Sequence, residues 1–436
     1  MQKTIFALAT GNQLSALSII RISGEECKNI IKKLTRKPVP KERLLTLRSF
    51  YFLKNKEKII DTCLFSWMPG PRSYTGEDSL EIYTHGGEAV FQSFFLVLSS
   101  LKNLKYADQG EFSKRAIING KINLVEAEAI NDLIYSQTEY QRELAIRQYN
   151  KGLSLPLVQW RKRLINSMAA VEAVIDFSEE EDTPSVLNIE KDLLRLKKDI
   201  EIVLENNECY ELVNNGIKVV FKGKPNAGKS SIFNAILKTE KSIVSNTPGT
   251  TRDIIHSKIN YKGYVINFYD TAGITSTNNE IEAEGIRRAK KLIKEADIIL
   301  NITENERIIK ASNNKEWIIL NKIDIKNDIS KEFLKKTIKV SAKTGKGIKG
   351  LLDKIYREIL LKAKPLNKEN TLVANTRQAL ELKETIANID KALLESSEEI
   401  IGEHLREANR SLERIIGNID IEEVLGNIFS NFCIGK

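Results

Sequence analysis

A short stretch near the middle of the chain could bind the phosphates of a nucleotide. Gly223–Ser230 reads Gly-Lys-Pro-Asn-Ala-Gly-Lys-Ser and matches the phosphate-binding pattern G-x-x-x-x-G-K-[ST]. The glycines let backbone N–H groups face phosphate oxygens, and a following helix adds its positive N-terminal end. Lys229 should reach the β- and γ-phosphates, and the Ser230 hydroxyl should ligate Mg²⁺. An apolar run at 217–221 is typical of a buried strand and 231–237 has helical spacing, which disfavours a chance glycine-rich turn.

Two further motifs supply groups that contact Mg²⁺ and the γ-phosphate in a GTPase. Thr250-Thr251-Arg252-Asp253 is a candidate switch I, in which Thr251 would complete the Mg²⁺ shell. Asp270-Thr271-Ala272-Gly273 ends a strand-like run. Asp270 would hold Mg²⁺ through water, and the Gly273 N–H would sense the γ-phosphate. We therefore expect Mg²⁺ at Ser230, Thr251 and Asp270.

Two motifs on the base side select the nucleotide. Asn321-Lys322-Ile323-Asp324 ends another strand, and the Asp324 carboxylate can accept hydrogen bonds from guanine N1 and N2. Adenine lacks this donor pair, and a site built for it strongly rejects an analogue without it. Ser341-Ala342-Lys343 supplies a second loop, with the Ala342 N–H toward guanine O6. The ordered motifs predict GTP as the ligand, contacted by Asn226, Ala227, Gly228, Lys229, Ser230, Ser231, Ser245, Asn246, Thr247, Pro248, Gly249, Thr250, Thr251, Asp270, Thr271, Ala272, Gly273, Asn321, Lys322, Asp324, Ser341, Ala342 and Lys343.

The group that activates water is not evident from these motifs. The position after Gly273 is Ile274, where Ras-like GTPases carry a glutamine that orients the attacking water. Isoleucine cannot hydrogen-bond water and no arginine finger is evident, so another group must act. Glu280, Glu282 and Glu284 are the nearest acidic candidates, and each could equally belong to a solvated face of switch II.

Length and composition limit the class of protein. A chain of 436 residues predicts about three domains, and 42% hydrophobic residues provide several cores. No apolar run approaches the ~20 residues of a membrane span, and the N-terminus lacks a signal-peptide pattern. The cysteines are widely spread and form no C-x-x-C pair, which favours reduced thiols in a cytoplasmic protein. The net charge of +9 permits an RNA partner or reflects a Lys- and Ile-rich bias.

The apolar spacing predicts the elements that position these residues. Residues 1–118 are expected to form an α+β domain with strands at Thr4–Ala9, Ala16–Ile22, Leu45–Leu53, Ile59–Trp67 and Ser79–Tyr83 and helices at Glu25–Leu34 and Glu88–Leu101. Helical spacing follows over 119–214 and returns over 365–436, where the last helix would be Ile421–Phe432.

Residues 215–364 alternate strand and helix, as a parallel sheet requires. The strand candidates are 217–221, 264–269, 297–300, 317–320 and 338–340. We therefore expect a multidomain α/β and α+β protein. A Ras-like GTPase domain with a parallel-type sheet and flanking helices would be inserted into an all-α domain built from both flanking segments.

The whole chain resembles the MnmE family, also called TrmE, of tRNA modification GTPases. The resemblance is carried by the GTPase motifs and by Ile20–Gly24, Ser73–Asp78, His85–Gly87, Gly110–Phe112, Asn119–Lys121, Ala127–Ala129 and Phe432–Lys436. The ending Phe-Cys-Ile-Gly-Lys is the most specific signature, because other GTPases lack it.

The resemblance implies a homodimer built through the N-terminal domain, whose fold would resemble the folate-binding domains of aminomethyltransferases. A 5-formyltetrahydrofolate or related tetrahydrofolate would bind there to Arg21, Glu81, Lys121 and Lys436. Arg21 and Lys121 suit an anionic glutamate tail or a carbonyl, and Glu81 can accept from the pterin ring. Without the resemblance, Arg21 and Glu81 would be interpreted as surface charges at strand ends.

The resemblance also implies K⁺ in place of an arginine finger. Its ligands would be the Asn226 side chain and backbone carbonyls of the loop Ser245–Thr250, from Ser245, Thr247 and Thr250. A cation beside the β–γ bridge would stabilise the transition state. The family's water-activating position falls on Glu282, so the expected catalytic residues are Glu282, Lys229, Gly273 and Thr251.

The implied partner is the FAD protein MnmG (GidA), in a heterotetramer-type complex that binds tRNA. Together they would install an aminomethyl-type group (carboxymethylaminomethyl) at carbon 5 of the wobble uridine of certain tRNAs. The chain departs from the family at Ala9–Ala16, which replaces a usual Pro/Gly/Arg-rich turn near the proposed folate pocket.

Two other functions fit the GTPase motifs. One is an RNA- or ribosome-assembly GTPase of the Era or EngA kind, which usually carries a KH-like module. Gly347-Ile348-Lys349-Gly350 matches the KH loop G-x-x-G but directly follows Ser341–Lys343 and is more simply the start of the last GTPase-domain helix. The other is a guanine-nucleotide scaffold that only recruits a partner.

Overall fold

The computed structural model of the chain describes residues 3–11, 14–55, 57–176, 186–239, 242–243, 255–270, 287, 290–304, 314–325, 337–363, 372–417 and 435. It divides into two compact units, Met1–Asn131 with Asn409–Lys436, and Asp132–Ala408. In the part of the chain that the structure describes, no helix is both long and apolar enough to cross a membrane.

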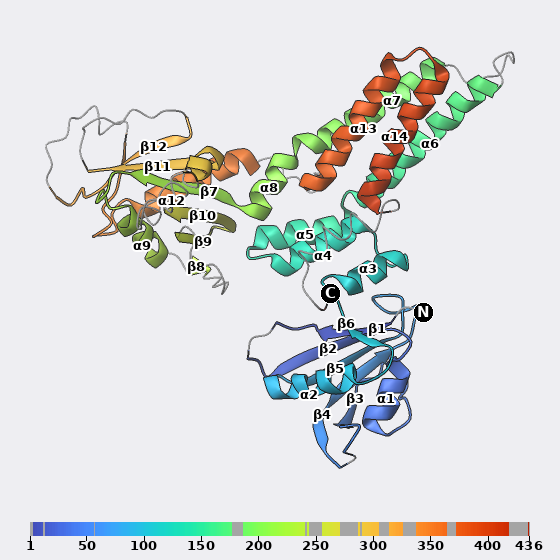
Figure 1. Cartoon of the computed structure of the whole chain (residues 1–436). Coiled ribbons are helices and arrows are strands. Elements are labelled where there is room, and N and C mark those ends of the chain that lie inside the picture. The colour runs from blue at the N-terminus through green and yellow to red at the C-terminus, as the bar shows by residue number, and fades with distance from the viewer. Residues whose placement is uncertain are drawn as a thin grey trace. The chain divides into compact units, whose positions relative to one another are not determined.

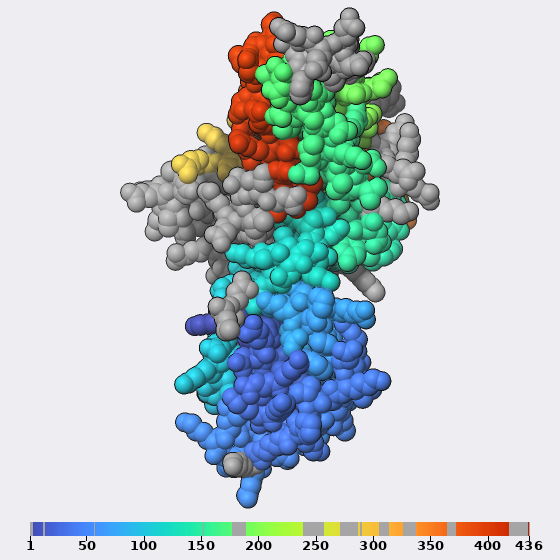
Figure 2. Space-filling view, turned by 90° about the vertical axis from the view of Figure 1, so that its right-hand side faces the viewer, coloured from blue at the N-terminus to red at the C-terminus, as the bar shows by residue number. Residues whose placement is uncertain are grey.

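The first unit is built on a six-stranded sheet in the order β3-β4-β5-β2-β1-β6 (Figure 1). The strands are β1 (Thr4–Leu8), β2 (Leu17–Ser23), β3 (Thr46–Tyr51), β4 (Ile59–Met68), β5 (Ser79–His85) and β6 (Leu104–Tyr106). All neighbouring strands are antiparallel except β1 and β6, which are parallel. The residues of this sheet and its helices form one compact body, which is blue in Figure 2.

Burial explains why these segments form strands. Alternate residues of β2 point into the core, and every residue of β1 is buried because both faces of this central strand are covered. The helices α1 (Cys27–Thr35) and α2 (Glu88–Ser99) contribute to the larger core, in which Phe50, Phe65 and Phe94 pack edge to face. The helices α3 (Glu111–Ile118) and α4 (Leu124–Tyr135) follow β6.

The second unit contains a helical part. Its helices are α5 (Glu139–Lys151), α6 (Ser154–Asp176), α7 (Val186–Glu205), α8 (Asn207–Asn215), α13 (Thr376–Leu394) and α14 (Glu398–Ile416), the last of which continues into the first unit. Capping boxes at Thr138 and Asn375 start α5 and α13. Helix α7 packs against both α6 and α13, and a Lys197–Asp390 ion pair of 2.6 Å joins α7 to α13.

The second unit also contains a seven-stranded sheet in the order β13-β12-β11-β7-β10-β9-β8. Its strands are β7 (Ile217–Gly223), β8 (Ser242–Ile243), β9 (Ile255–Tyr261), β10 (Tyr264–Asp270), β11 (Ile298–Thr303), β12 (Glu316–Leu320) and β13 (Ile338–Lys339). The five strands from β13 to β10 are parallel to one another, whereas β9 pairs antiparallel with both β10 and β8. Helices α9 (Lys229–Thr239) and α12 (Ile348–Ala363) pack on its apolar side chains.

The chain enters and leaves this sheet through adjacent segments. The side-chain amides of Asn206 and Asn207, at the start of α8, donate to the carbonyls of Leu372 and Ala374 at 3.1 and 2.8 Å. The Tyr140 ring of α5 stacks on Tyr264 of β10 with centroids 4.5 Å apart. Adjacent entry and exit segments are what a domain inserted into a helical frame requires.

Candidate functional site

The loop between β7 and α9 has the backbone that its glycines predict. Gly223 has φ +146°, and a Cβ there would lie 2.5 Å from the carbonyl oxygen of Ile302. Gly228 has φ +88°, and a Cβ there would lie 2.1 Å from Asn321 Nδ2. A side chain at either position would push the loop off the strand β11 or the loop after β12. The two glycines therefore fix the loop at the carboxyl end of the sheet, where nucleotides bind in such folds.

Lys229 is held by backbone carbonyls of this loop, and Asn226 has a left-handed backbone conformation. Lys229 is buried, and its Nζ donates to the carbonyl oxygens of Gly223 and Lys224 at 3.0 Å each. This ammonium therefore lies over the loop, beside the N-terminus of α9. Asn226 has φ +63°, in the left-handed region that asparagine tolerates better than most residues.

Ser230 and Asp270 meet where β7 and β10 end side by side. Ser230 Oγ donates to Asp270 Oδ2 at 2.8 Å, and the Asp270 residue is fully buried. A hydroxyl and a carboxylate at hydrogen-bond distance are hard oxygen donors of the kind that Mg²⁺ takes alongside phosphate and water. No group of three or more His, Cys, Asp or Glu side chains that could hold a metal occurs among the described residues. The residues present therefore fit a magnesium ion shared with a phosphate.

The base-side motifs are joined to the phosphate loop through one amide. Asn321 Nδ2 donates to the Ala227 carbonyl at 3.1 Å, and Asn321 Oδ1 accepts from the Ala342 N–H at 3.2 Å. Asn321 is buried. Since a buried amide with both ends bound is fixed in orientation, it holds the phosphate loop and the Ser341–Lys343 loop in register.

Asp324 is held by the loop opposite it. Ser341 Oγ donates to Asp324 Oδ1 at 2.6 Å, and this hydrogen bond lowers the pKa of Asp324, with a further contribution from the charge of Lys343. The carboxylate therefore stays ionised near neutrality, as an acceptor for guanine must. Lys322 has φ +60° and its ammonium pairs with Glu304 at 2.6 Å, so its side chain is directed along the neighbouring loop.

A second cluster of polar residues lies on the sheet of the first unit. Arg21 of β2 and Glu81 of β5 are directly opposite, and Arg21 Nε and Nη2 bind Glu81 Oε1 at 3.0 and 2.9 Å. Tyr83 donates its hydroxyl to Glu81 Oε2 at 2.9 Å. Burial, followed by this hydrogen bond, raises the pKa of Tyr83 to about 12. Arg21 Nη1 also donates to the Gly435 carbonyl at 3.3 Å, which brings Gly435 to the pair.

The loop Gly70–Asp78 frames this cluster. The Arg21 guanidinium lies 5.6 Å from the Tyr74 ring and 5.9 Å from the Phe112 ring. Lys121 donates to the Pro71 carbonyl at 2.9 Å on the same loop. Arg21 and Glu81 are thus brought together, Lys121 contacts the same loop elsewhere, and no contact between Lys121 and Arg21 occurs in the structure.

Several predicted site residues lie outside the described residues. They are Ser245, Asn246, Thr247, Pro248, Gly249, Thr250, Thr251, Thr271, Ala272, Gly273, Glu282 and Lys436, as are the expected helix Ile421–Phe432 and Cys433. Ser231 and Lys343 are described and lie in α9 and in the loop before α12. Gly347 directly precedes α12 and has φ +84°, and a Cβ there would lie 2.1 Å from the Lys339 carbonyl oxygen. Gly347–Gly350 is therefore a turn and helix start of the GTPase domain.

Sequence reasoning missed two features of these sites. Tyr83 was not identified, and its only signal is its place two residues after Glu81 on the same face of β5. Glu316 was also missed: it is buried at the start of β12 and binds Lys222 of β7 at 3.0 Å and the Asn301 amide of β11 at 2.7 Å. No motif includes Glu316, because it starts a short strand far along the chain.

Comparison with known proteins covers the whole chain. The family model described as the MnmE helical domain matches residues 124–433, and the model of the GTP-binding protein TrmE N-terminus matches residues 4–121. A tRNA modification GTPase MnmE of Rhizobium etli (strain CIAT 652) is 36% identical over 441 residues, covering 100% of this chain and 99% of that protein. One of Agrobacterium fabrum (strain C58 / ATCC 33970) is 38% identical over 443 residues, covering 99% of each. The chain belongs to the MnmE family of tRNA modification GTPases.

The G domain of T. maritima FeoB is 27% identical with a TM-score of 0.25, and covers 34% of this chain and 98% of that chain. The GTPase domain of this MnmE-family chain is the seven-stranded sheet with its phosphate loop and the Asn321–Asp324 motif. The chain is therefore a GTPase that binds GTP. The sequence-based prediction of the family and of the multidomain fold is confirmed.

Proposed function

We propose that this chain hydrolyses GTP in a K⁺-dependent way to drive wobble-uridine modification of tRNA. With the FAD protein MnmG it would install a carboxymethylaminomethyl-type group at carbon 5, using a 5-formyltetrahydrofolate-type one-carbon donor. The observation that carries the proposal is the presence of two separate sites in one chain. One is the Asn321-linked guanine site, and the other is the Arg21–Glu81 pair that the C-terminal tail reaches.

The GTPase half assigns roles to residues around the phosphate loop. Ser230, Asp270 and Thr251 would hold Mg²⁺, which neutralises phosphate charge when bound. Asn226 would hold K⁺ together with the carbonyls of Ser245, Thr247 and Thr250, and a cation held there would supply positive charge that stabilises the transition state. Lys229 positions the β- and γ-phosphates.

Water activation is assigned to a different group. Glu282 would orient the attacking water in the place where Ras-like proteins use glutamine, since Ile274 cannot. Gly273 and Thr251 would bind the γ-phosphate and Mg²⁺ as the switches close.

The one-carbon half uses the first unit. Arg21, Glu81, Lys121 and Lys436 would bind the folate, and Tyr83 holds the Glu81 carboxylate in place. The folate supplies a formyl-level carbon when bound, and the protein orients it. Arg21 and Lys121 suit the anionic glutamate tail or a carbonyl, and Glu81 can accept from the donor edge of a pterin ring.

The proposed organisation follows the same division. Residues 1–118 would form the folate-binding and dimerisation domain, 119–214 and 365–436 the helical domain, and 215–364 the inserted GTPase domain. We expect a cytoplasmic homodimer that associates with MnmG in a heterotetramer-type complex on tRNA.

Reconstitution tests this proposal. The purified chain, MnmG, GTP, 5-formyltetrahydrofolate, an amine donor and unmodified tRNA are combined in KCl, and nucleosides are identified by mass spectrometry. A C5-modified wobble uridine that requires all the protein and nucleotide components is expected. Unmodified uridine in the complete mixture, with active GTP hydrolysis, would reject the modification half of the proposal.

A further inference from the structure

A group of cations lies beside the candidate one-carbon site of the first unit. Arg43 Nη2 donates to the carbonyl oxygen of Arg72, and Lys121 Nζ donates to that of Pro71 at 2.9 Å. Because Pro71 and Arg72 are consecutive, these contacts gather Arg43, Arg72 and Lys121 around one short stretch of backbone. All three residues are exposed.

In the described part of the chain, no acidic side chain pairs with these three cations. Among the residues that the structure describes, none of Arg43, Arg72 and Lys121 forms an ion pair with a carboxylate. Arg21 and Arg115 of the same unit are different, since each binds a glutamate at 2.9 Å. Arg43 and Lys121 are satisfied only by backbone carbonyls, which leave their positive charge uncompensated toward solvent.

The positive charge extends along the segment that leads to Arg43. Between residues 27 and 48 eight basic residues accompany a single acidic one, Glu42. The Arg36 guanidinium stacks 4.0 Å from the Tyr51 ring. The Arg43 N–H donates to the Trp67 carbonyl at 2.8 Å, and Lys28 of α1 lies 5.2 Å from the Trp67 ring. The end of the segment and α1 therefore share one surface.

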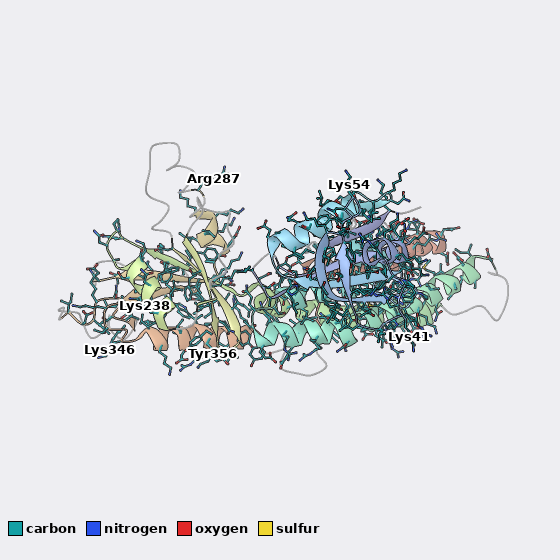
Figure 3. The ribbon with its side chains drawn as sticks, turned by 90° about the horizontal axis from the view of Figure 1, so that it is seen from below. Lys41, Lys54, Lys238, Arg287, Lys346 and Tyr356 are labelled. Atoms are coloured by element: carbon teal, nitrogen blue, oxygen red, sulfur yellow. The ribbon has the colours of Figure 1, made fainter. Side chains whose placement is uncertain are left out.

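Lys28 is paired with Asp78 at 3.7 Å, so we leave it out and give the name basic rim to five other exposed cations, Lys37, Lys41, Arg43, Arg72 and Lys121. Lys41 is labelled in Figure 3. The rim contains no described ion pair to a carboxylate over its whole length, and it ends at Lys121, which we propose as a folate contact.

We propose that the basic rim binds the phosphate backbone of the tRNA and holds it beside the one-carbon site. The inference rests on the proposed function, since it takes tRNA as the substrate. Exposed Lys and Arg side chains bind a phosphate backbone without reading its sequence, and this suits a protein that acts on several tRNAs. A strand bound along the rim reaches Lys121 and so brings a nucleotide to the carbon donor. An oligoglutamate tail on the folate would need only the Lys121 end, whereas the cations continue to Lys37.

The test separates the rim from folding and from both proposed ligand sites. The triple variant Lys37→Gln/Lys41→Gln/Arg72→Gln removes charge from side chains that make no described contact and lie outside the GTP and folate sites. The control is Lys102→Gln, an exposed lysine between α2 and β6, at the sheet edge opposite β3. Binding of fluorescently labelled tRNA to the full-length chain is measured across a salt series.

Each lost phosphate contact should lower the slope of log affinity against log salt by about 0.9, so the triple variant should lose about 2–3 and bind roughly 10-fold or more weakly at low salt. Lys102→Gln should retain the wild-type slope. GTP hydrolysis, 5-formyltetrahydrofolate binding and MnmG binding should be unchanged in the triple variant.

Three outcomes would overturn the rim assignment. One is a wild-type salt slope and affinity in the triple variant. Another is a defect confined to triglutamyl folate, which would assign the rim to the cofactor tail. The third is a defect confined to MnmG binding, which would make the rim a protein interface. If the wild-type chain supports wobble modification while the triple variant keeps full tRNA affinity, the basic rim does not bind tRNA and the proposed function is unaffected. A wild-type chain that supports no modification removes the proposed function itself.

Discussion

The Arg21 guanidinium donates to the carbonyl oxygen of Gly435 at 3.3 Å although 414 residues separate the two in sequence. Gly435 has φ +102°, and a Cβ there would lie 2.4 Å from the Leu8 carbonyl oxygen. Gly435 therefore lies against β1, and only glycine fits at this position. Because the other side of the guanidinium binds Glu81, Arg21 connects Gly435 to the carboxylate that we propose for pterin binding.

Displacing the tail should stop modification without touching the GTPase. Deleting Cys433–Lys436 removes Lys436 and the Gly435 contact, so wobble modification should be lost while GTP binding stays at the wild-type level. Gly435→Ala should reproduce part of this loss, because alanine costs on the order of 1 kcal/mol at positive φ and meets Leu8. Gly350→Ala, in α12, is the control, because a Cβ there would meet nothing within 4 Å. For the deletion and for Gly435→Ala, nucleoside analysis measures wobble modification and GTP titration measures nucleotide binding. Wild-type modification by the truncated chain would refute the role of the tail.

Asp324→Asn should shift the nucleotide preference from guanosine toward xanthosine nucleotides. The carboxylate that accepts from guanine N1 and N2 becomes an amide, which can donate to the extra xanthine oxygen. Since the Ser341 hydrogen bond lowers the pKa of Asp324, the wild-type preference for guanine should not change with pH near neutrality. Competition of GTP and XTP for the purified variant measures this, and unchanged guanine selectivity would remove the assignment.

GTP turnover should require K⁺ and respond poorly to Na⁺, whose smaller radius fits a carbonyl cage badly. Asn226→Gly is the sharper of two variants, because glycine adopts the observed φ of +63° and removes the side chain, with its oxygen, without adding backbone strain. Asn226→Ala adds backbone strain to the same deletion. Both should lose K⁺ stimulation and still bind GTP through Lys229. Equal turnover of the wild-type chain in KCl and NaCl would contradict the potassium site.

Glu282→Ala should separate the chemical step from the cation. We expect K⁺ also to promote pairing of two GTPase domains across the homodimer, and this pairing should persist in the variant. Hydrolysis should fall by on the order of 10²-fold because the water is no longer oriented. Glu280→Ala and Glu284→Ala are matched controls from the same stretch. Single-turnover hydrolysis is the measurement, and a normal rate in Glu282→Ala would assign water activation elsewhere.

Tyr83 should make the fold sensitive to alkaline pH. Burial raises the pKa of Tyr83 from 10.0 to about 12. Between these two pH values the unfolded chain has released the Tyr83 proton, whereas the folded chain keeps it. Because the unfolded state then binds fewer protons, the free energy of unfolding falls as the pH rises. Tyr83→Phe should therefore lose stability less steeply than the wild type between these values. Thermal unfolding measured over a series of pH values tests this, with Tyr106→Phe, at an exposed position, as the control. Parallel plots of stability against pH for the wild type and Tyr83→Phe would contradict it.

The GTPase site could be predicted because its groups stand in contiguous motifs with strict backbone demands. Gly223 and Gly228 lie where only glycine fits, and all five strand candidates of this domain occur in the structure. The strand β9 was missed because polar residues interrupt Ile255–Tyr261, and the edge strand β6 because it has three residues. Pairing with a neighbour, and not local propensity, makes each of these segments a strand.

The one-carbon site could be predicted only in part. Apolar spacing placed Arg21 and Glu81 on strands but could not show that β2 and β5 are neighbours, since that pairing depends on the whole sheet. The Arg21–Gly435 contact follows from no periodicity, and only the family resemblance suggested that the tail arrives there. The insertion of the GTPase domain, the switch residues and Lys436 stay predictions.

The most direct test of the central claim is the wobble nucleoside content of tRNA in cells that lack this chain, measured by mass spectrometry beside a ribosome profile. The account predicts that C5-modified wobble uridine disappears, that ribosomal subunits stay normal, and that the intact chain restores the modification. Full modification together with a defect in ribosome assembly would contradict the account and would favour an assembly GTPase.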